Sequence, residues 1–270
     1  MKQILFTFLL LSTVILTSCR KDKVDPNISE YDDLQIQNYI KANNISGMVR
    51  DTSDTDTAGM YYQILNEGNT ANPIQYSDYV SMVYTIRSFD GKYKALDTIT
   101  NHYAGYLGQF SGLGLPKGLQ SAIHNVLKYK GGSMRLLIPS RLAYGINGYG
   151  SGSSGNVDGR IDGNQCLDYF VRIVDNQDVY DQIAIEKYKT ANSLTGYTVT
   201  PSGLHYKISG LDTGATVSKY SRITAGYKLY YLNGTLLQET TTTDLTALME
   251  ELRPGVQEGL LLTKTGQTIS

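Results

Sequence analysis

Two stretches of the chain, residues 31–43 and 180–192, share one spacing of apolar and polar positions. In each stretch apolar side chains recur near a period of 3.6 residues, which predicts a short amphipathic helix. The apolar positions are Tyr31, Leu34, Tyr39 and Ala42 in the first stretch, and Tyr180, Ile183, Tyr188 and Ala191 in the second. A polar, linker-like segment follows each stretch, so we expect each helix to precede a further folded unit.

The segments that follow the two helices also match each other in order. The matching pairs are 59–64 with 203–208, 80–92 with 222–235, and 115–122 with 252–259. The middle pair consists of strand-like runs broken by Asp-Gly or Asn-Gly, which is a strong hairpin signal. The sequence therefore predicts two copies of one unit. The second copy stops at Ser270 before its last strands, and because such a sheet would have open edges we expect a truncation there.

The first residues predict export and a lipid anchor. Lys2 precedes an almost entirely apolar run over 4–18, which is shorter than a membrane-spanning helix and typical of a signal peptide. Residues 16–19, Leu-Thr-Ser-Cys, resemble a bacterial lipobox, in which Cys19 receives the lipid. We expect a lipid-anchored protein of the cell envelope, at the outer membrane facing the periplasm or at the cell surface. Plain secretion with an unmodified Cys19 is the alternative.

Composition and charge exclude some classes of function. The net charge of −1 provides no basic surface for nucleic acid. A lipid on Cys19 leaves Cys166 as the remaining cysteine, so no internal disulfide is expected. The histidines share no ligand spacing, and the Gly/Ser-rich segment 150–155 fits G-x-G-x-x-G without the strand and helix that a dinucleotide site requires. We interpret that segment as an enlarged loop, with loose calcium binding by the aspartates of 156–164 as an alternative.

Residues 114–145 carry the most specific pattern in the chain. They combine a helix with one apolar face, a Gly-Gly turn, a strand that ends at Pro139, and the loop SRLAYG. This order resembles the FKBP-type peptidyl-prolyl cis-trans isomerases, in which a V-I-P-G-W-like run opens the central helix and a strand ends in I-P-x-x-x-A-Y-G. Residues 61–68 and 166–175 resemble the first and last strands of that family.

The resemblance implies an α+β fold, with an FKBP-like antiparallel half-barrel wrapped around one central helix. It implies that this unit is present twice and that a short helix precedes each copy. The expected divisions are a lipoprotein signal peptide (1–18), a tether (19–30), a helical leader and linker (31–55), the first domain (56–178), a second leader (179–200) and an incomplete second domain (201–270).

The same resemblance assigns a pocket, residue by residue. Tyr84, Asp97 and Tyr144 would be catalytic, and Leu96, Leu115, Pro116, Leu119 and Tyr169 would bind substrate. Leu119 replaces the family's tryptophan, and Pro116 lacks the backbone N–H with which the family binds a carbonyl oxygen. The match at Leu96 and Asp97 requires two additional residues after Gly91. Packing alone would also place Tyr84 on a strand and Leu119 in a core.

The implied reaction is rotation about Xaa-Pro peptide bonds, whose barrier is ~18–20 kcal/mol. It requires an apolar, aromatic pocket and no cofactor or metal. The expected partners are proline-containing unfolded or exported proteins and, through the N-terminal lipid, a membrane, but no nucleic acid. A chaperone or binding lipoprotein that has lost catalysis is the alternative favoured by Pro116 and Leu119. The tyrosine content, 22 residues, leaves a carbohydrate-binding surface lipoprotein as a third.

Overall fold

The structure is a computed structural model that describes residues 27–150 and 159–270. The expected signal peptide, Cys19 and the tether up to residue 26 lie outside the described residues, as does most of the Gly/Ser-rich segment. Within the described part, no helix has the length and apolar character that crossing a membrane requires.

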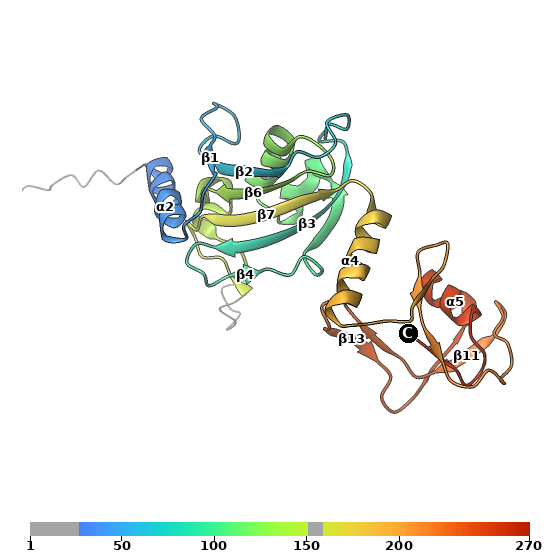
Figure 1. The fold of residues 1–270 in the computed structure, drawn as a ribbon. Helices are drawn as coiled ribbons and strands as arrows, with labels where there is room; N and C mark the ends of the chain where they lie inside the picture. Colours follow the sequence, from blue (N-terminus) through green and yellow to red (C-terminus); the bar gives the residue numbers. More distant parts are fainter. Residues whose placement is uncertain (1–26, 151–158) are drawn as a thin grey trace, which may run out of the picture.

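The larger part of the chain forms a seven-stranded antiparallel sheet in the order β1-β2-β6-β7-β3-β4, with β5 also paired to β3 (Figure 1). Its strands are β1 (Val49–Arg50), β2 (Tyr61–Asn66), β3 (Tyr79–Ser88), β4 (Lys94–Ala95), β5 (His102–Tyr106), β6 (Ser133–Ile138) and β7 (Leu167–Val174). β7 lies between β6 and β3, and Tyr169 is in register with Leu136 on one side and Ile86 on the other. The strands expected over 61–68 and 166–175 are present as β2 and β7.

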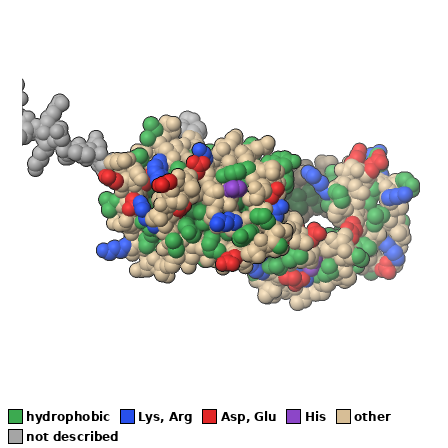
Figure 2. Space-filling view, turned by 90° about the horizontal axis from the view of Figure 1, so that it is seen from above, with side chains coloured by type: hydrophobic (Ala, Val, Ile, Leu, Met, Phe, Trp, Pro, Cys, Tyr) green, Lys and Arg blue, Asp and Glu red, His purple; other side chains and the backbone are tan. Residues whose placement is uncertain are grey.

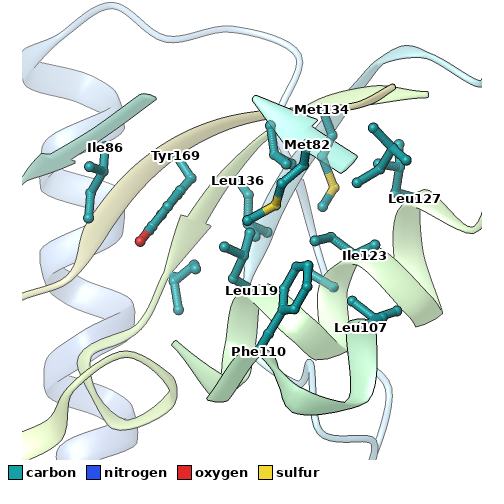
Figure 3. Close-up of a cluster of buried hydrophobic side chains, with 14 of the residues drawn as sticks. Met82, Ile86, Leu107, Phe110, Leu119, Ile123, Leu127, Met134, Leu136 and Tyr169 are labelled. Carbon is teal, nitrogen blue, oxygen red and sulfur yellow. The ribbon is translucent and has the colours of Figure 1, made fainter. Parts of the chain in front are cut away.

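One face of this sheet is covered by the central helix. α3 (Lys117–Ala122) continues as a π-helical turn, η2 (Ile123–Leu127). Leu119, Ile123 and Leu127 point into the sheet and are buried among the alternate residues of β3, β6 and β7 (Figure 3). The 3-10 helix η1 (Leu107–Leu113) adds Phe110 to the same core. The helix that the apolar pattern predicts is therefore confirmed.

The opposite face of the sheet is covered by α2 (Ile28–Ala42) (Figure 1). Its Ile36 is fully buried against Tyr61, Leu137 and Cys166. Tyr39 stacks on Phe89 with the ring centroids 3.8 Å apart. The helix expected over 31–43 is thus present, and it is packed on the domain that follows it.

The buried stripe of α2 differs from the one that the apolar spacing predicts. Leu34 is 56% exposed and Tyr31 is also exposed, whereas Asp32 and Ile36 are buried. The reason is that the loop after β6, which lies against α2, donates hydrogen bonds from Ser140 and Arg141, so a carboxylate at Asp32 is buried there in place of an apolar side chain.

α4 (Gln177–Ala191) follows β7 and leads to the C-terminal segment (Figure 1). This segment contains two-stranded sheets and the helix α5 (Pro254–Leu261). The strand pairs are β8 (Thr198–Val199) with β9 (His205–Tyr206), β10 (Ile208–Ser209) with β15 (Thr268–Ile269), β11 (Arg222–Ala225) with β14 (Leu245–Leu248), and β12 (Lys228–Tyr230) with β13 (Leu236–Glu239). These pairs are not joined into one sheet among the residues described, so a second complete sheet like that of the first domain is not formed there.

The packing of α2 predicts that one apolar side chain of this helix supports the stability of the domain and another does not. Ile36→Ala should lower the free energy of unfolding by about 2–4 kcal/mol, because it leaves a cavity in a fully buried site. Leu34→Ala, on the exposed side of the same helix, should change it by no more than about 0.5 kcal/mol. Urea unfolding followed by circular dichroism measures both. Equal effects of the two changes would contradict the packing described for α2.

Candidate functional site

A group of tyrosines lies on the face of the sheet that α3 covers. It consists of Tyr84, Tyr93, Tyr144, Tyr149 and Tyr169. The rings of Tyr84 and Tyr169 are 6.0 Å apart, and those of Tyr144 and Tyr149 stack at 4.7 Å. We refer to this group below as the tyrosine cluster.

The fold explains why these side chains meet. Tyr84 and Tyr169 lie on the neighbouring strands β3 and β7, and alternation along each strand directs both toward α3. Figure 3 shows Tyr169 pointing to the same side of the sheet as Ile86 and Leu136. Tyr93 lies in the hairpin between β3 and β4, where its backbone N–H and carbonyl both bond to Ser88.

Tyr144 and Tyr149 come from the loop that follows β6. This loop contains the short 3-10 helices η3 (Ser140–Leu142) and η4 (Gly145–Asn147). The backbone of Tyr149 pairs with that of Ile161, which closes the base of the loop. The hydroxyl of Tyr144 donates to the carbonyl oxygen of Gly114 at 3.0 Å. Gly114 has φ +87°, so a left-handed residue at the end of η1 presents this acceptor.

Four phenols of the cluster, those of Tyr84, Tyr93, Tyr144 and Tyr169, have raised pKa values and are neutral at physiological pH. Burial raises the pKa of Tyr144 and Tyr169 well above the usual value. Neighbouring phenols add to the shift at Tyr169, whereas at Tyr144 the interaction with Tyr169 partly offsets it. Burial also raises the pKa of Tyr84 and Tyr93, with smaller effects from other members of the cluster. These four residues therefore offer aromatic faces and neutral hydroxyl groups rather than a phenolate that could act as a base.

Several residues assigned from the resemblance lie next to this cluster. Leu119 is fully buried in the core against which the cluster packs, and Leu115 is half-buried against the same core. Pro116 is the N-cap residue of α3. Because proline has no N–H, the backbone at this point offers no donor to a bound carbonyl group. The structure thus brings Tyr84, Tyr144 and Tyr169 together with Leu115 and Leu119.

Leu96 and Asp97 have a different environment. Leu96 is 51% exposed. The carboxylate of Asp97 accepts from the N–H of Ile99 at 2.9 Å and from the side-chain amide of Asn233. Among the contacts of the described residues, none joins Asp97 to the tyrosine cluster, because its carboxylate stabilises the turn after β4. A catalytic role for Asp97 stays a prediction.

Ion pairs hold the segment around Asp162, which precedes β7. Lys92 in the β3–β4 hairpin pairs with Asp162 at 2.9 Å, and Asp162 also pairs with Arg160. Asp162 is one of the aspartates considered above for loose calcium binding. In the described part of the chain, no group of His, Cys, Asp or Glu side chains is placed to hold a metal ion.

The resemblance to the FKBP-type isomerases did not identify Tyr93 and Tyr149 as members of the site. Both lie in connections whose lengths differ from the family pattern, so a residue-by-residue match cannot reach them. The available signal is that each is a tyrosine near a matched motif: Tyr93 is close to Gly91, and Tyr149 is close to the AYG motif.

The antiparallel sheet wrapped around one helix is an α+β fold, which is the architecture that the resemblance to the FKBP-type isomerases implies. No protein-family model matches the sequence, and no curated protein matches it. Solved structures that are similar include FkpA from Escherichia coli, with 22% identity and a TM-score of 0.39 over 65% of this chain and 72% of that one. A peptidyl-prolyl cis-trans isomerase from Pseudomonas syringae pv. tomato has 21% identity and a TM-score of 0.37, over 54% and 93%. AtFKBP13 has 17% identity and a TM-score of 0.34, over 43% and 91%.

The raised pKa values predict that the cluster affects stability at alkaline pH. Each buried phenol favours folding fully below its unfolded pKa of about 10, and this contribution is lost as the pH rises toward the folded pKa. Above pH 10 the free energy of unfolding should therefore fall less steeply in Tyr144→Phe or Tyr169→Phe than in the unchanged chain. Tyr220→Phe, at a side chain that is 83% exposed, controls for the loss of one phenol. Identical pH profiles for all variants would contradict the burial of the cluster.

Proposed function

We propose that the domain built on the seven-stranded sheet is a peptidyl-prolyl cis-trans isomerase. The observation that carries this proposal is the tyrosine cluster, in which aromatic faces and hydroxyl groups meet beside the core that contains the fully buried Leu119. Rotation about an Xaa-Pro bond requires no covalent step. It requires surroundings that favour the twisted amide over the planar, more polar one.

The cluster can supply both parts of such an environment. Aromatic rings exclude water from the amide, which removes hydrogen bonds that stabilise its planar form. Hydroxyl groups can then donate to the carbonyl oxygen as it turns. The hydroxyl of Tyr144 already donates to Gly114, and because a hydroxyl rotates it can exchange this acceptor for the substrate. This donor would replace the backbone N–H that Pro116 lacks.

We also propose that residues 201–270 are a partial copy of the same unit. The pairing of β10 with β15 parallels that of β2 with β6, and β12 with β13 parallels β3 with β4. The preceding helices make corresponding contacts. Asp33 of α2 bonds to Tyr61 of β2, and Gln182 of α4 bonds to His205 of β9 at the matching position.

The expected location completes the proposal. A lipid on Cys19 would hold the protein in the cell envelope, where exported proteins with Xaa-Pro bonds fold. The partners would be these unfolded or exported proteins, and the membrane would be contacted through the N-terminal lipid.

A chaperone or binding lipoprotein without catalysis is the second candidate, and exposed apolar side chains in the C-terminal segment favour it. On β12 and β13 and between them, Leu229, Tyr231 and Leu237 are 40–52% exposed. Figure 2 shows hydrophobic side chains at the surface of the molecule, scattered among charged ones. Such side chains can contact the apolar segments of unfolded proteins.

The cis-to-trans rate of a short Leu-Pro peptide tests the proposed activity. We expect the rate to rise in proportion to the concentration of protein, and Tyr144→Phe to lower kcat/KM about tenfold, because one hydrogen bond to the turning carbonyl is lost. Asp97→Ala should have a smaller effect, since Ile99 and Asn233 already bond to this carboxylate. Tyr220→Phe is the control.

The results separate the candidates. Unchanged turnover in both Tyr144→Phe and Asp97→Ala would make the assignment of the site wrong, even in an active domain. If a folded sample slows the aggregation of an unfolded protein without accelerating the isomerisation of the peptide, that result would favour the chaperone.

A further inference from the structure

Asp32 of α2 is a carboxylate buried at the boundary between this helix and the domain. Its side chain is 1% exposed. It accepts from the hydroxyl of Ser140 at 2.6 Å, from the backbone N–H of Arg141 at 3.2 Å and from the thiol of Cys166 at 3.6 Å. Burial raises the pKa of Cys166 to about 12, and the charge of Asp32 adds to this effect, so the thiol keeps its proton and stays a donor.

Two of these donors belong to η3, the 3-10 helix that leads to Tyr144. The residue before η3 is Pro139, which provides no side-chain cap for the first N–H groups of the helix. Asp32 supplies that cap from another element, more than a hundred positions earlier in the chain. A carboxylate that accepts a backbone N–H at the start of a helix is a stabilising arrangement, and burial strengthens it.

The rest of η3 is fixed from the other side. A side chain added at Gly118 of α3 would approach the carbonyl oxygen of Leu142 to 2.7 Å, so the two backbones are in close contact. The guanidinium group of Arg141 donates to the carbonyl oxygen of Ala58 at 2.6 Å. Asp32 thus contacts η3 on one side and α3 contacts it on the other, and Tyr144 follows two residues after Leu142, the last residue of η3.

We propose that Asp32 is a positioning residue for Tyr144, and that α2 is therefore part of the functional unit and more than a spacer. Asp32 makes no contact with the cluster, and it acts through η3. The inference rests on the proposed isomerase function for its effect on rate, while its effect on the position of Tyr144 is independent of that function.

The neighbouring Asp33 offers a matched control on the same helix. Its carboxylate accepts from Arg50 at 2.9 Å and from the hydroxyl of Tyr61 at 3.0 Å. These contacts attach α2 to β1 and β2 and do not involve η3. Loss of Asp33 therefore loosens the same helix without removing the cap of η3.

The experiment compares Asp32→Asn with Asp33→Asn in the full chain. The first readout is kcat and KM for a Leu-Pro peptide. The second is the fluorine NMR signal of 3-fluorotyrosine incorporated at position 144. For Asp32→Asn we expect kcat to fall about tenfold with little change in KM, since the bound peptide meets a misplaced hydroxyl group. The fluorine signal should shift or split. Asp33→Asn should leave both readouts unchanged.

Equal effects of the two substitutions on both readouts would mean that α2 only stabilises the domain, which would overturn the proposal. An unchanged fluorine signal in a folded Asp32→Asn protein would also overturn it. If the unchanged chain does not accelerate isomerisation, the proposed function fails, and the fluorine signals still decide whether Asp32 positions Tyr144.

If Asp32→Asn does not fold, Ser140→Ala removes one donor and keeps the carboxylate. This variant should then shift the same signal, and an unshifted signal would overturn the proposal.

Discussion

The position of β7 at the centre of the sheet is the constraint on which the rest of the domain depends. Because β7 pairs with both β6 and β3, its successive side chains must point to opposite faces of the sheet. Asp168 points to the α2 face, where it holds Arg135 through paired hydrogen bonds of 3.0 and 2.7 Å and accepts from the hydroxyl of Tyr39 at 3.0 Å. Tyr169, the next residue, is buried in the tyrosine cluster. One strand thus organises both the docking of α2 and the candidate site.

The two faces are also connected through the loop after β6. Asp32 reaches this loop from the α2 face, and Tyr144 leaves it toward the cluster. A connection of this kind would suit the proposed isomerisation, in which no covalent bond is made or broken and the protein would contribute a shaped, dry site and oriented donors. Neutral phenols fit this proposed role, since a charged group beside the amide would retain water around it.

Local signals in the sequence predict the elements of the fold well, because their physical causes are local. The turn at Asp90-Gly91, the strand that stops before Pro139 and the apolar face of the central helix are all in place. Burial of Asp32 could not be predicted, since its donors lie over a hundred residues away. The same holds for Tyr93 and Tyr149, which reach the cluster from loops of unmatched length. Tyr84, Tyr144 and Tyr169 are expected as neighbours because the resemblance to the FKBP-type isomerases assigns them to one pocket.

The most direct test of this account is to map where a Leu-Pro peptide binds, using NMR spectra of the protein with labelled tyrosine rings. The account predicts that the signals of Tyr84, Tyr144, Tyr149 and Tyr169 change together as peptide is added, and that exchange between the cis and trans peptide becomes faster in the same samples. Changes confined to the exposed tyrosines of the C-terminal segment, with the cluster unaffected, would contradict it.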